Sequence, residues 1–336
     1  MHSATTPHIN PSRRLALLLV SLFTTTTASH LAMAQQPPAD FPIKPIRLIV
    51  PFAPGSGTDV VGRVVSERLA ERLRVPIVVE NKDGAGGVIG TQLAAKAPAD
   101  GYTLLMVTNS TIIAPQLQSP PAYDPLNALA WVSRAARIPL ALVASANAPF
   151  KTARELVEYA KTNPGKISFA TSGRGSQSEI EVEYLKQVFG IDMVDIPYKS
   201  GPQGAADVVA GNVPLYLTTL AMLGPHIKTG KVRALAVGGA QRSSIFPDSP
   251  TFGEALGLSD YQPAAWFGIA APKGTPDSIV RKLSFEVLAL MKEEGVKSRL
   301  DAMGAEPAYL PSEEFVRQVR DEAERWAKVV SARGRR

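Results

Sequence analysis

The sequence contains no cysteine, which excludes disulfide bonds, thiolate catalysis and cysteine-ligated metal sites. Histidine is scarce as well: of the four histidines, only His226 lies beyond residue 34. One histidine without cysteine does not favour a zinc site, and general-base chemistry would depend on His226 or on carboxylates. His226 has no serine elbow or paired acid within sequence reach. We therefore expect no catalytic residue set, no metal site and no cofactor.

Long apolar segments are absent too. The run Leu15–Phe23 is far shorter than the roughly 20 residues that a membrane-spanning helix needs. It follows Arg13-Arg14 and precedes Ala32-Met33-Ala34, the order of a basic region, an apolar region and a small-residue cleavage site. Residues 1–34 are thus predicted to be a signal peptide, cleaved near Ala34, and the protein to be periplasmic. The residues that should follow a twin-arginine pair are missing, which favours the Sec route.

Neither sign of charge dominates the sequence. The formal net charge of +6 falls by two when Arg13 and Arg14 leave with the signal, an excess too small to indicate a nucleic-acid partner. The 336 residues exceed what one hydrophobic core usually serves, so two lobes are expected.

Strands and helices alternate from Ile46 onwards. The predicted strands are continuous apolar runs, which indicates a parallel sheet covered by helices on both faces. The first helix carries apolar residues at helical spacing and places most of its charges on the other side. This first α/β set comprises strands Ile46–Phe52, Ile77–Glu80 and Tyr102–Val107 with helices Asp59–Leu73 and Val88–Ala97.

A second α/β set follows a proline-rich connection. It begins with a strand at Leu140–Val143 and a helix that Thr152 and Glu155 open as a capping box. Two long C-terminal helices, 276–294 and 312–330, have no core of their own and should pack back on the first set. The predicted α/β fold therefore has two lobes, a hinge and an interlobe cleft, with residues 35–138 plus 250–336 in lobe 1 and residues 139–249 in lobe 2. The remaining predicted elements are strands 167–170, 194–196, 213–217, 232–237 and 266–271 and helices 176–189 and 202–210.

Glycine-rich loops stand at the carboxyl ends of two predicted strands. A helix N-terminus leaves backbone N–H groups without partners and carries roughly half a positive charge, so two such loops facing each other would hold an anion with two ends. The alternative for the first loop is a plain connection in which Thr58 or Asp59 caps the helix. Ligands in open α/β sheets bind outside the carboxyl ends of the strands, where the predicted cleft is lined by Pro54–Asp59, Asn81–Gly90, Thr171–Ser176 and Tyr198–Gly204.

Some residues of these loops have a structural reading beside the functional one. Ser176 with Glu179 would form a capping box; if Glu179 faced the cleft instead, its charge would disfavour a second carboxylate and favour an amine or amide. Arg174 and Lys199 could each pair with a ligand carboxylate or be solvated loop charges. The glycines of residues 84–90 have the wrong spacing for a dinucleotide site.

Eight ordered segments at consistent spacing carry a family resemblance. They include IRLIVPFAPGSGTDVVGR, FATSGRGS, IPYKSGPQGAADVVAGNV and FPDSPTFGEALG. Over nearly the whole mature chain, the segments resemble the Bug family, the periplasmic solute-binding receptors of tripartite tricarboxylate transporters. The resemblance implies a type II periplasmic-binding-protein fold whose lobes close on a small carboxylated solute and deliver it to the permease subunits of the transporter.

By position, the resemblance also implies ligand-binding residues in four loops. These are Pro54, Gly55, Ser56, Gly57 and Asp59, then Gly86 and Gly87, then Thr171, Ser172, Gly173 and Ser176, and finally Tyr198, Lys199 and Gln203. We add Thr58 and Arg174 to the predicted ligand-binding residues, because they lie in the same loops. The chain departs from the family pattern at Ser56 and Ser200 in place of glycine, Asp83 in place of proline, Glu179 in place of histidine and Pro214 in place of aspartate.

A binding protein, taken as a monomer, is thus the function that the sequence favours. Two alternatives stay open: a receptor that presents its ligand to a sensor kinase, and an exported hydrolase that uses carboxylates in the same cleft. The solute class is also open, because di- or tricarboxylates, acidic amino acids and aromatic or pyridine carboxylates all suit such a cleft.

Overall fold

The computed structural model describes residues 41–173, 175–243 and 245–333. The predicted signal peptide and Arg174 lie outside the described residues. From Pro42 onwards the chain forms one compact unit of mixed α/β structure. Within the described ranges, no helix combines the length and the apolar character that a bilayer crossing requires.

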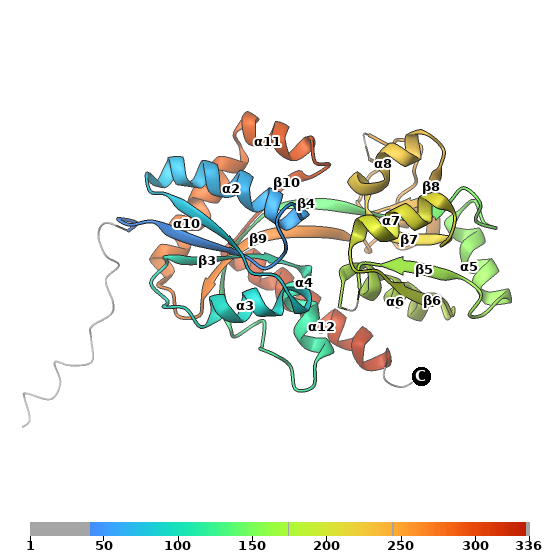
Figure 1. Cartoon of the computed structure of the whole chain (residues 1–336), viewed down its shortest axis with the longest axis horizontal. Helices are drawn as coiled ribbons and strands as arrows, with labels where there is room; N and C mark the ends of the chain where they lie inside the picture. Colours follow the sequence, from blue (N-terminus) through green and yellow to red (C-terminus); the bar gives the residue numbers. More distant parts are fainter. Residues whose placement is uncertain (1–40, 174, 244, 334–336) are drawn as a thin grey trace, which may run out of the picture. The chain divides into compact units, whose positions relative to one another are not determined.

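The described strands form one continuous pairing network (Figure 1). Its order is β2-β1-β3-β9-β4-β7-β5-β6, and β8 and β10 pair with β4. The pairs that β1 forms with β2 and β3, and β5 with β6 and β7, are parallel, as the apolar runs predicted, whereas β4 and β9 pair antiparallel with all their partners. The strands are β1 Ile46–Val50, β2 Ile77–Asn81, β3 Thr103–Thr108, β4 Leu129–Ser145, β5 Ser168–Thr171, β6 Val194–Pro197, β7 Leu215–Thr219, β8 Val232–Val237, β9 Ala264–Pro272 and β10 Glu306–Pro311.

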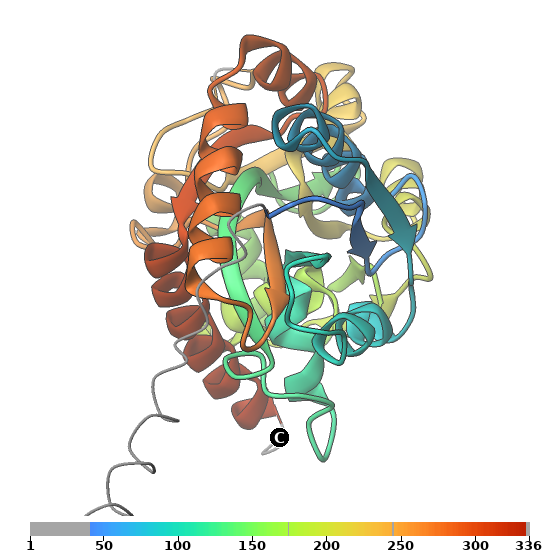
Figure 2. The same cartoon turned by 90° about the vertical axis from the view of Figure 1, so that its left-hand side faces the viewer.

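Helices connect these strands and cover the sheet. They are α2 Gly57–Leu73, α3 Val88–Ala95, α4 Asn109–Ile113, α5 Ala153–Thr162, α6 Gln177–Phe189, α7 Gly201–Ala210, α8 Leu220–Lys228, α9 Phe252–Leu256, α10 Asp277–Met291, α11 Glu294–Asp301 and α12 Ser312–Arg333, with 3₁₀ turns η1 Ala85–Gly87 and η2 Ala114–Leu117. In Figure 2, α10 and α12 lie beside each other, and both contact β4.

Strand β4 joins the two sets of strands (Figure 1). Its first part, Leu129–Pro139, pairs with β9, and its last residues pair with β7 and β8. The sequence predicted only Leu140–Val143, because Arg134 and Arg137 interrupt the apolar pattern upstream. Both arginines turn to β10: the Arg134 Nε donates to the Ala308 carbonyl at 2.6 Å, and Arg137 forms an ion pair with Glu306.

Aromatic rings fill the core where β4, β9 and α12 meet. Trp131 and Trp266 each pack edge-on against Phe315, with ring centroids 5.3 and 5.2 Å apart. All three rings are buried. A separate core forms around β5 and β7, and it includes Phe252 and Tyr261 from the segment that leads into β9.

Several predicted helix ends shift in the structure. The N-cap of α2 is Ser56, not Thr58 or Asp59, because Gly55 turns the chain at φ +79° before the helix begins. The predicted helix 276–294 ends at Met291, and α11 follows as a separate helix. The sequence missed α4, which is too short to show a helical period, and α8, which contains Gly224-Pro225.

A substitution at Gly268 of β9 would test how tightly β9 and β4 pack. A Cβ built there would lie 2.6 Å from the Ser133 carbonyl oxygen and 2.7 Å from the Phe315 ring. Since the carbonyl belongs to the paired strand β4 and cannot move away cheaply, Gly268→Ala should lower the free energy of unfolding by about 1–3 kcal/mol, measured by denaturant titration. Gly295→Ala is the control: it lies in α11 with its nearest neighbour at 3.6 Å, and it should be neutral or slightly stabilising. Equal effects of the two substitutions would contradict this packing.

Candidate ligand-binding site

A cavity of about 760 Å³ lies at the carboxyl ends of the parallel strands. Loops after β1, β2, β3, β5, β6 and β7 line it, together with residues of β4 and β9. This is the edge at which the sequence predicted a cleft. Of the predicted site residues, the cavity brings together Pro54, Gly55, Ser56, Gly57, Thr58, Gly86, Gly87, Ser172, Ser176 and Lys199.

Two turns on this edge have the same construction. Gly55 and Gly175 both have φ +79°, and the serine that follows each one caps the next helix. The Ser56 Oγ accepts from the Asp59 N–H at 3.2 Å, and the Ser176 Oγ accepts from the Glu179 N–H at 3.4 Å. The repeated pattern Gly-Ser-x-x-acid therefore builds the start of α2 and the start of α6 alike.

The acidic residue of each turn bonds back to the glycine. The Gly55 N–H donates to Asp59 Oδ2 at 2.9 Å, and the Gly175 N–H donates to Glu179 Oε2 at 2.7 Å. Both acids are buried and neither lines the cavity. The sequence allowed Glu179 either a structural role or a position facing the cleft, and the structure shows the structural role. Its carboxylate bonds to Gly175 rather than closing a capping box on Ser176.

Asp59, which does not line the cavity, holds the first turn in place through hydrogen bonds. Its carboxylate accepts from the Arg63 Nε at 3.0 Å and from the Asn81 Nδ2 at 2.8 Å, besides the Gly55 N–H. Burial alone would raise the pKa of Asp59, but these hydrogen bonds together hold it below its usual value. Asp59 therefore stays ionised and fixes the loop that the cavity uses.

Four other predicted residues also lie outside the cavity lining. Thr171 is fully buried at the end of β5, and Gly173 forms the turn beyond it at φ +96°. The Tyr198 hydroxyl donates to Asp207 Oδ2 at 2.5 Å, which directs it along α7, and Gln203 is exposed on the same helix. Lys199, between Tyr198 and Ser200, does line the cavity.

Within the described part of the chain, six helices begin at this cavity. The first residues of α2, α4, α6 and α7 line it, as do Gly87, the N-cap of α3, and Thr219, the N-cap of α8. The first N–H groups of a helix have no intrahelical partners, and the peptide dipoles add positive potential there. The Ser200 and Thr219 side chains make no capping bond to their own helices, so their hydroxyls are available to a ligand. The geometry suits an anion.

Sequence reasoning missed the contributions of α4 and α8. Ser110 follows β3, and Thr218 and Thr219 end β7. The rule that ligands bind at the carboxyl ends of strands would have found both positions if it had been applied to these strands as it was to β1 and β5.

Charged side chains are few at this site. Among the described lining residues, Lys199 is the one cation and Asp83 the one anion, and both are exposed. Apolar side chains of the lining form the apolar wall of the cavity; they are Phe52, Leu140, Leu217, Met222 and Phe267. The cavity therefore combines a polar, electropositive side with a surface for a carbon skeleton.

Two amide side chains separate this cavity from a charged cavity of about 340 Å³ behind it. Asn109 lines both cavities, and its Oδ1 accepts from the Trp266 N–H at 2.9 Å. Gln177 lines the front cavity and donates to Glu181 Oε1 at 3.1 Å. Glu322 of α12 accepts from the Asn109 Nδ2 at 3.3 Å and the Trp266 Nε1 at 3.0 Å. Trp266 is thus a packed aromatic behind the site.

Glu181 is the most perturbed carboxyl of this wall. Burial raises its pKa to about 7, against the lowering effect of hydrogen bonds from Tyr261 and Gln177. Glu322 adds a further raising effect through its charge, and Arg325 a lowering one. The Tyr261 hydroxyl donates to Glu181 Oε2 at 2.7 Å.

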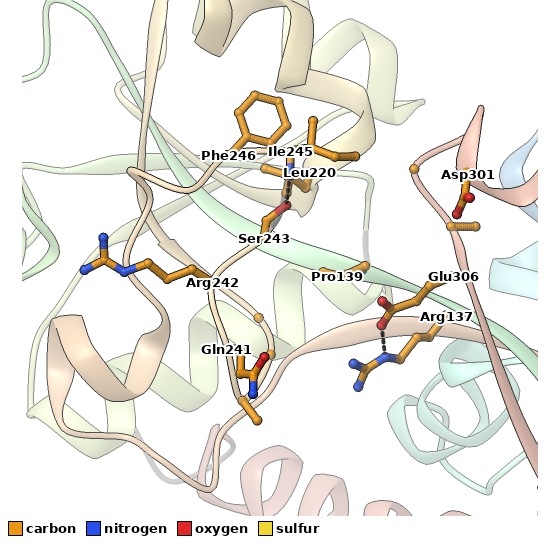
Figure 3. A pocket seen from close by; sticks show the side chains of 15 residues that line it. Arg137, Pro139, Leu220, Gln241, Arg242, Ser243, Ile245, Phe246, Asp301 and Glu306 are labelled. Atoms are coloured by element: carbon orange, nitrogen blue, oxygen red, sulfur yellow. Dashed lines mark hydrogen bonds and ion pairs between the residues drawn. The ribbon is translucent and has the colours of Figure 1, made fainter.

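A further cavity, of about 530 Å³, lies beside the crossing of β4 and contains its own charged residues (Figure 3). Arg137 forms an ion pair with Glu306 there, and Arg242 pairs with Glu254 at 3.0 Å. Its arginines are thus already neutralised by protein carboxylates. Its described lining includes the start of one helix, α8 at Leu220, so the front cavity, where several helices begin, is the better anion site.

Comparisons with known proteins point to one family. The chain matches the family described as tripartite tricarboxylate transporter family receptor, TctC, over residues 61–335. BugT of Bordetella pertussis (strain Tohama I) is 35% identical over 329 residues, which cover 97% of this chain and 99% of that protein. The structure of MatC from Rhodopseudomonas palustris with bound malate is 31% identical, with a TM-score of 0.74, and the match covers 86% of this chain and 100% of that chain. A second R. palustris structure, with adipate, is 32% identical, with a TM-score of 0.76 and coverage of 88% and 99%.

Glu181 predicts a pH dependence of stability. Because its pKa is raised in the folded state, the folded protein binds this proton more tightly than the unfolded chain between about pH 4.5 and 7. Its contribution to stability is therefore greatest below this window and falls by roughly 3 kcal/mol as the pH rises through it.

Glu181→Gln should remove this loss, since a neutral amide mimics the protonated acid. The free energy of unfolding of the variant, minus that of the parent, should rise between pH 5 and 8 in denaturant titrations. Glu324→Gln, an exposed position on α12, should give a flat difference. A flat difference for Glu181→Gln as well would show that Glu181 does not titrate in this range.

Proposed function

The chain belongs to the family of tripartite tricarboxylate transporter receptors, and from this premise we propose that it captures a small carboxylate in the front cavity and delivers it to a membrane permease. Receptors of this family are periplasmic solute-binding proteins and not enzymes, and the fold is the one seen in the binding protein BugD. The resemblance carried by the sequence segments is thus confirmed. Delivery to a permease follows from the family's role.

The convergence of six helix N-termini is the observation that carries this proposal. Partially positive N–H groups and free hydroxyls suit a carboxylate, and they do so without a buried side-chain cation that would have to be desolvated. The apolar wall suits the carbon skeleton between carboxylates. The dicarboxylates in the two R. palustris structures, malate and adipate, support the same ligand class.

Closure about the crossing strands is the second part of the proposal. The cavity is lined from both strand sets, and β4 and β9 are the strands that run from one set towards the other. We propose that the chain passes from one lobe to the other near Pro139 and near Ala264, not at residue 250. The reason is that Phe252 and Tyr261 pack in the core of the second set.

Gly57 provides the test, because it is the first residue of α2 and faces the cavity. A Cβ at Gly57 would lie 3.8 Å from the Phe267 ring, an ordinary contact, so a side chain can be added at this point of the cavity lining. Gly57→Val should leave the melting temperature of the free protein nearly unchanged and weaken carboxylate binding at least tenfold. Gly295→Val, at the start of α11, is the matched control and should bind as the parent does.

The measurement is a thermal-shift series on ligand-stripped protein with aliphatic, aromatic and pyridine carboxylates, amino acids and their amides. A ligand at about 100 times its dissociation constant stabilises the fold by roughly 2.7 kcal/mol, enough to raise the melting temperature by several degrees. The proposal is wrong if no carboxylate raises the melting temperature of the parent protein. It is also wrong if Gly57→Val binds carboxylates as tightly as the parent does.

A further inference from the structure

Gln177 occupies an uncommon position, at the first residue of α6 and in the wall between the two cavities. Its amide nitrogen donates to the Ala264 carbonyl at 2.8 Å and to Glu181 Oε1 at 3.1 Å. A carboxamide has two N–H donors, so both are used within the protein. The side-chain carbonyl oxygen of Gln177 remains for a hydrogen bond with a ligand.

The orientation of this amide is determined by its partners. Turning it over would place the amide oxygen against the Ala264 backbone carbonyl, which can only accept. Ala264 and Glu181 line the rear cavity, whereas Gln177 lines the front one. The amide nitrogen of Gln177 therefore faces the rear cavity, and its amide oxygen faces the front cavity.

Glu181 is itself held in place. It is 2% exposed, and the Tyr261 hydroxyl donates to its second oxygen at 2.7 Å. The charges nearest to it from the packed elements are Glu322 and Arg325 of α12. Because one anchor of Gln177 is backbone and the other is a buried carboxyl, its amide is preorganised rather than free to rotate towards whatever ligand arrives.

The other amide of the wall does not offer the same acceptor. The Asn109 oxygen accepts from the Trp266 N–H, and its nitrogen donates to Glu322. The remaining polar groups of the α6 turn are donors or hydroxyls: N–H groups, Ser176 and Ser178. The Gln177 amide oxygen is thus a fixed hydrogen-bond acceptor beside the donors of the α6 turn.

We propose that Gln177 makes the site selective for organic acids that carry a hydroxyl or ammonium group next to the carboxylate bound at the start of α6. This inference rests on the proposed function, since it assumes a carboxylate there. The ligand's donor would meet the Gln177 oxygen, whereas an unsubstituted acid would leave that oxygen without its partner, at a cost in affinity. A second carboxylate at this point would face a carbonyl oxygen and be disfavoured.

Matched ligand pairs test the proposal on the purified protein by calorimetry. The pairs are malate and succinate, 2-hydroxyglutarate and glutarate, lactate and propionate, and aspartate and succinate, whose members differ only in the donor group. In every pair that binds, the donor-bearing acid should bind about three- to tenfold more tightly, the effect of one hydrogen bond.

Gln177→Met should abolish this ratio, because methionine keeps the length of the side chain but lacks the amide oxygen. Lys199→Met is the control: it removes the one described cation of the lining, so it should weaken both members of a pair and keep their ratio.

Equal affinities within the pairs for the parent protein would overturn the inference without any variant, so it does not depend on how well Gln177→Met folds. A ratio that survives in Gln177→Met would overturn it as well. If no acid of any pair binds while acids outside the pairs do, the inference falls and the proposed function stands. If no carboxylate binds at all, both fail.

Discussion

Unsatisfied backbone N–H groups at helix starts are the constraint on which this structure depends. Each helix leaves such groups at its N-terminus, and they must find a partner in the protein, in water or in a ligand. Here six of these starts lie at one edge, at the carboxyl ends of the parallel strands, and the cavity is there. Since the partial charges are part of the backbone, the site needs few charged side chains, and Lys199 is the one described cation of its lining.

The buried acidic residues near the site bond to other groups of the protein. Asp59 and Glu179 tie the glycine of each turn to the helix that follows, which sets the direction of the first N–H groups. Glu181 and Glu322 stand one layer further back and hold Gln177 and Asn109. This second layer links the ligand cavity to α12, so the C-terminal helix contributes to the site without touching it.

The crossing of β4 and β9 explains how a chain of two α/β sets can behave as one receptor. Trp131, Trp266 and Phe315 pack where α12 covers this crossing, and Gly268 has no room for a side chain there. The pairing partner of β4 changes from β9 to β7 near Pro139.

Much of the local structure followed from sequence pattern alone, because strand runs, helical periods and Gly-Ser turns are set by residues close together in the chain. The parallel strands, the turns at Gly55 and Gly175 and the family resemblance were all readable in this way. The side chains that face the cavity were not, since Asp59, Tyr198 and Gln177 look alike as polar loop residues. Their roles depend on partners distant in sequence or on the next turn of a helix, such as Asn81, Asp207 and Ala264, and only the tertiary structure brings these together.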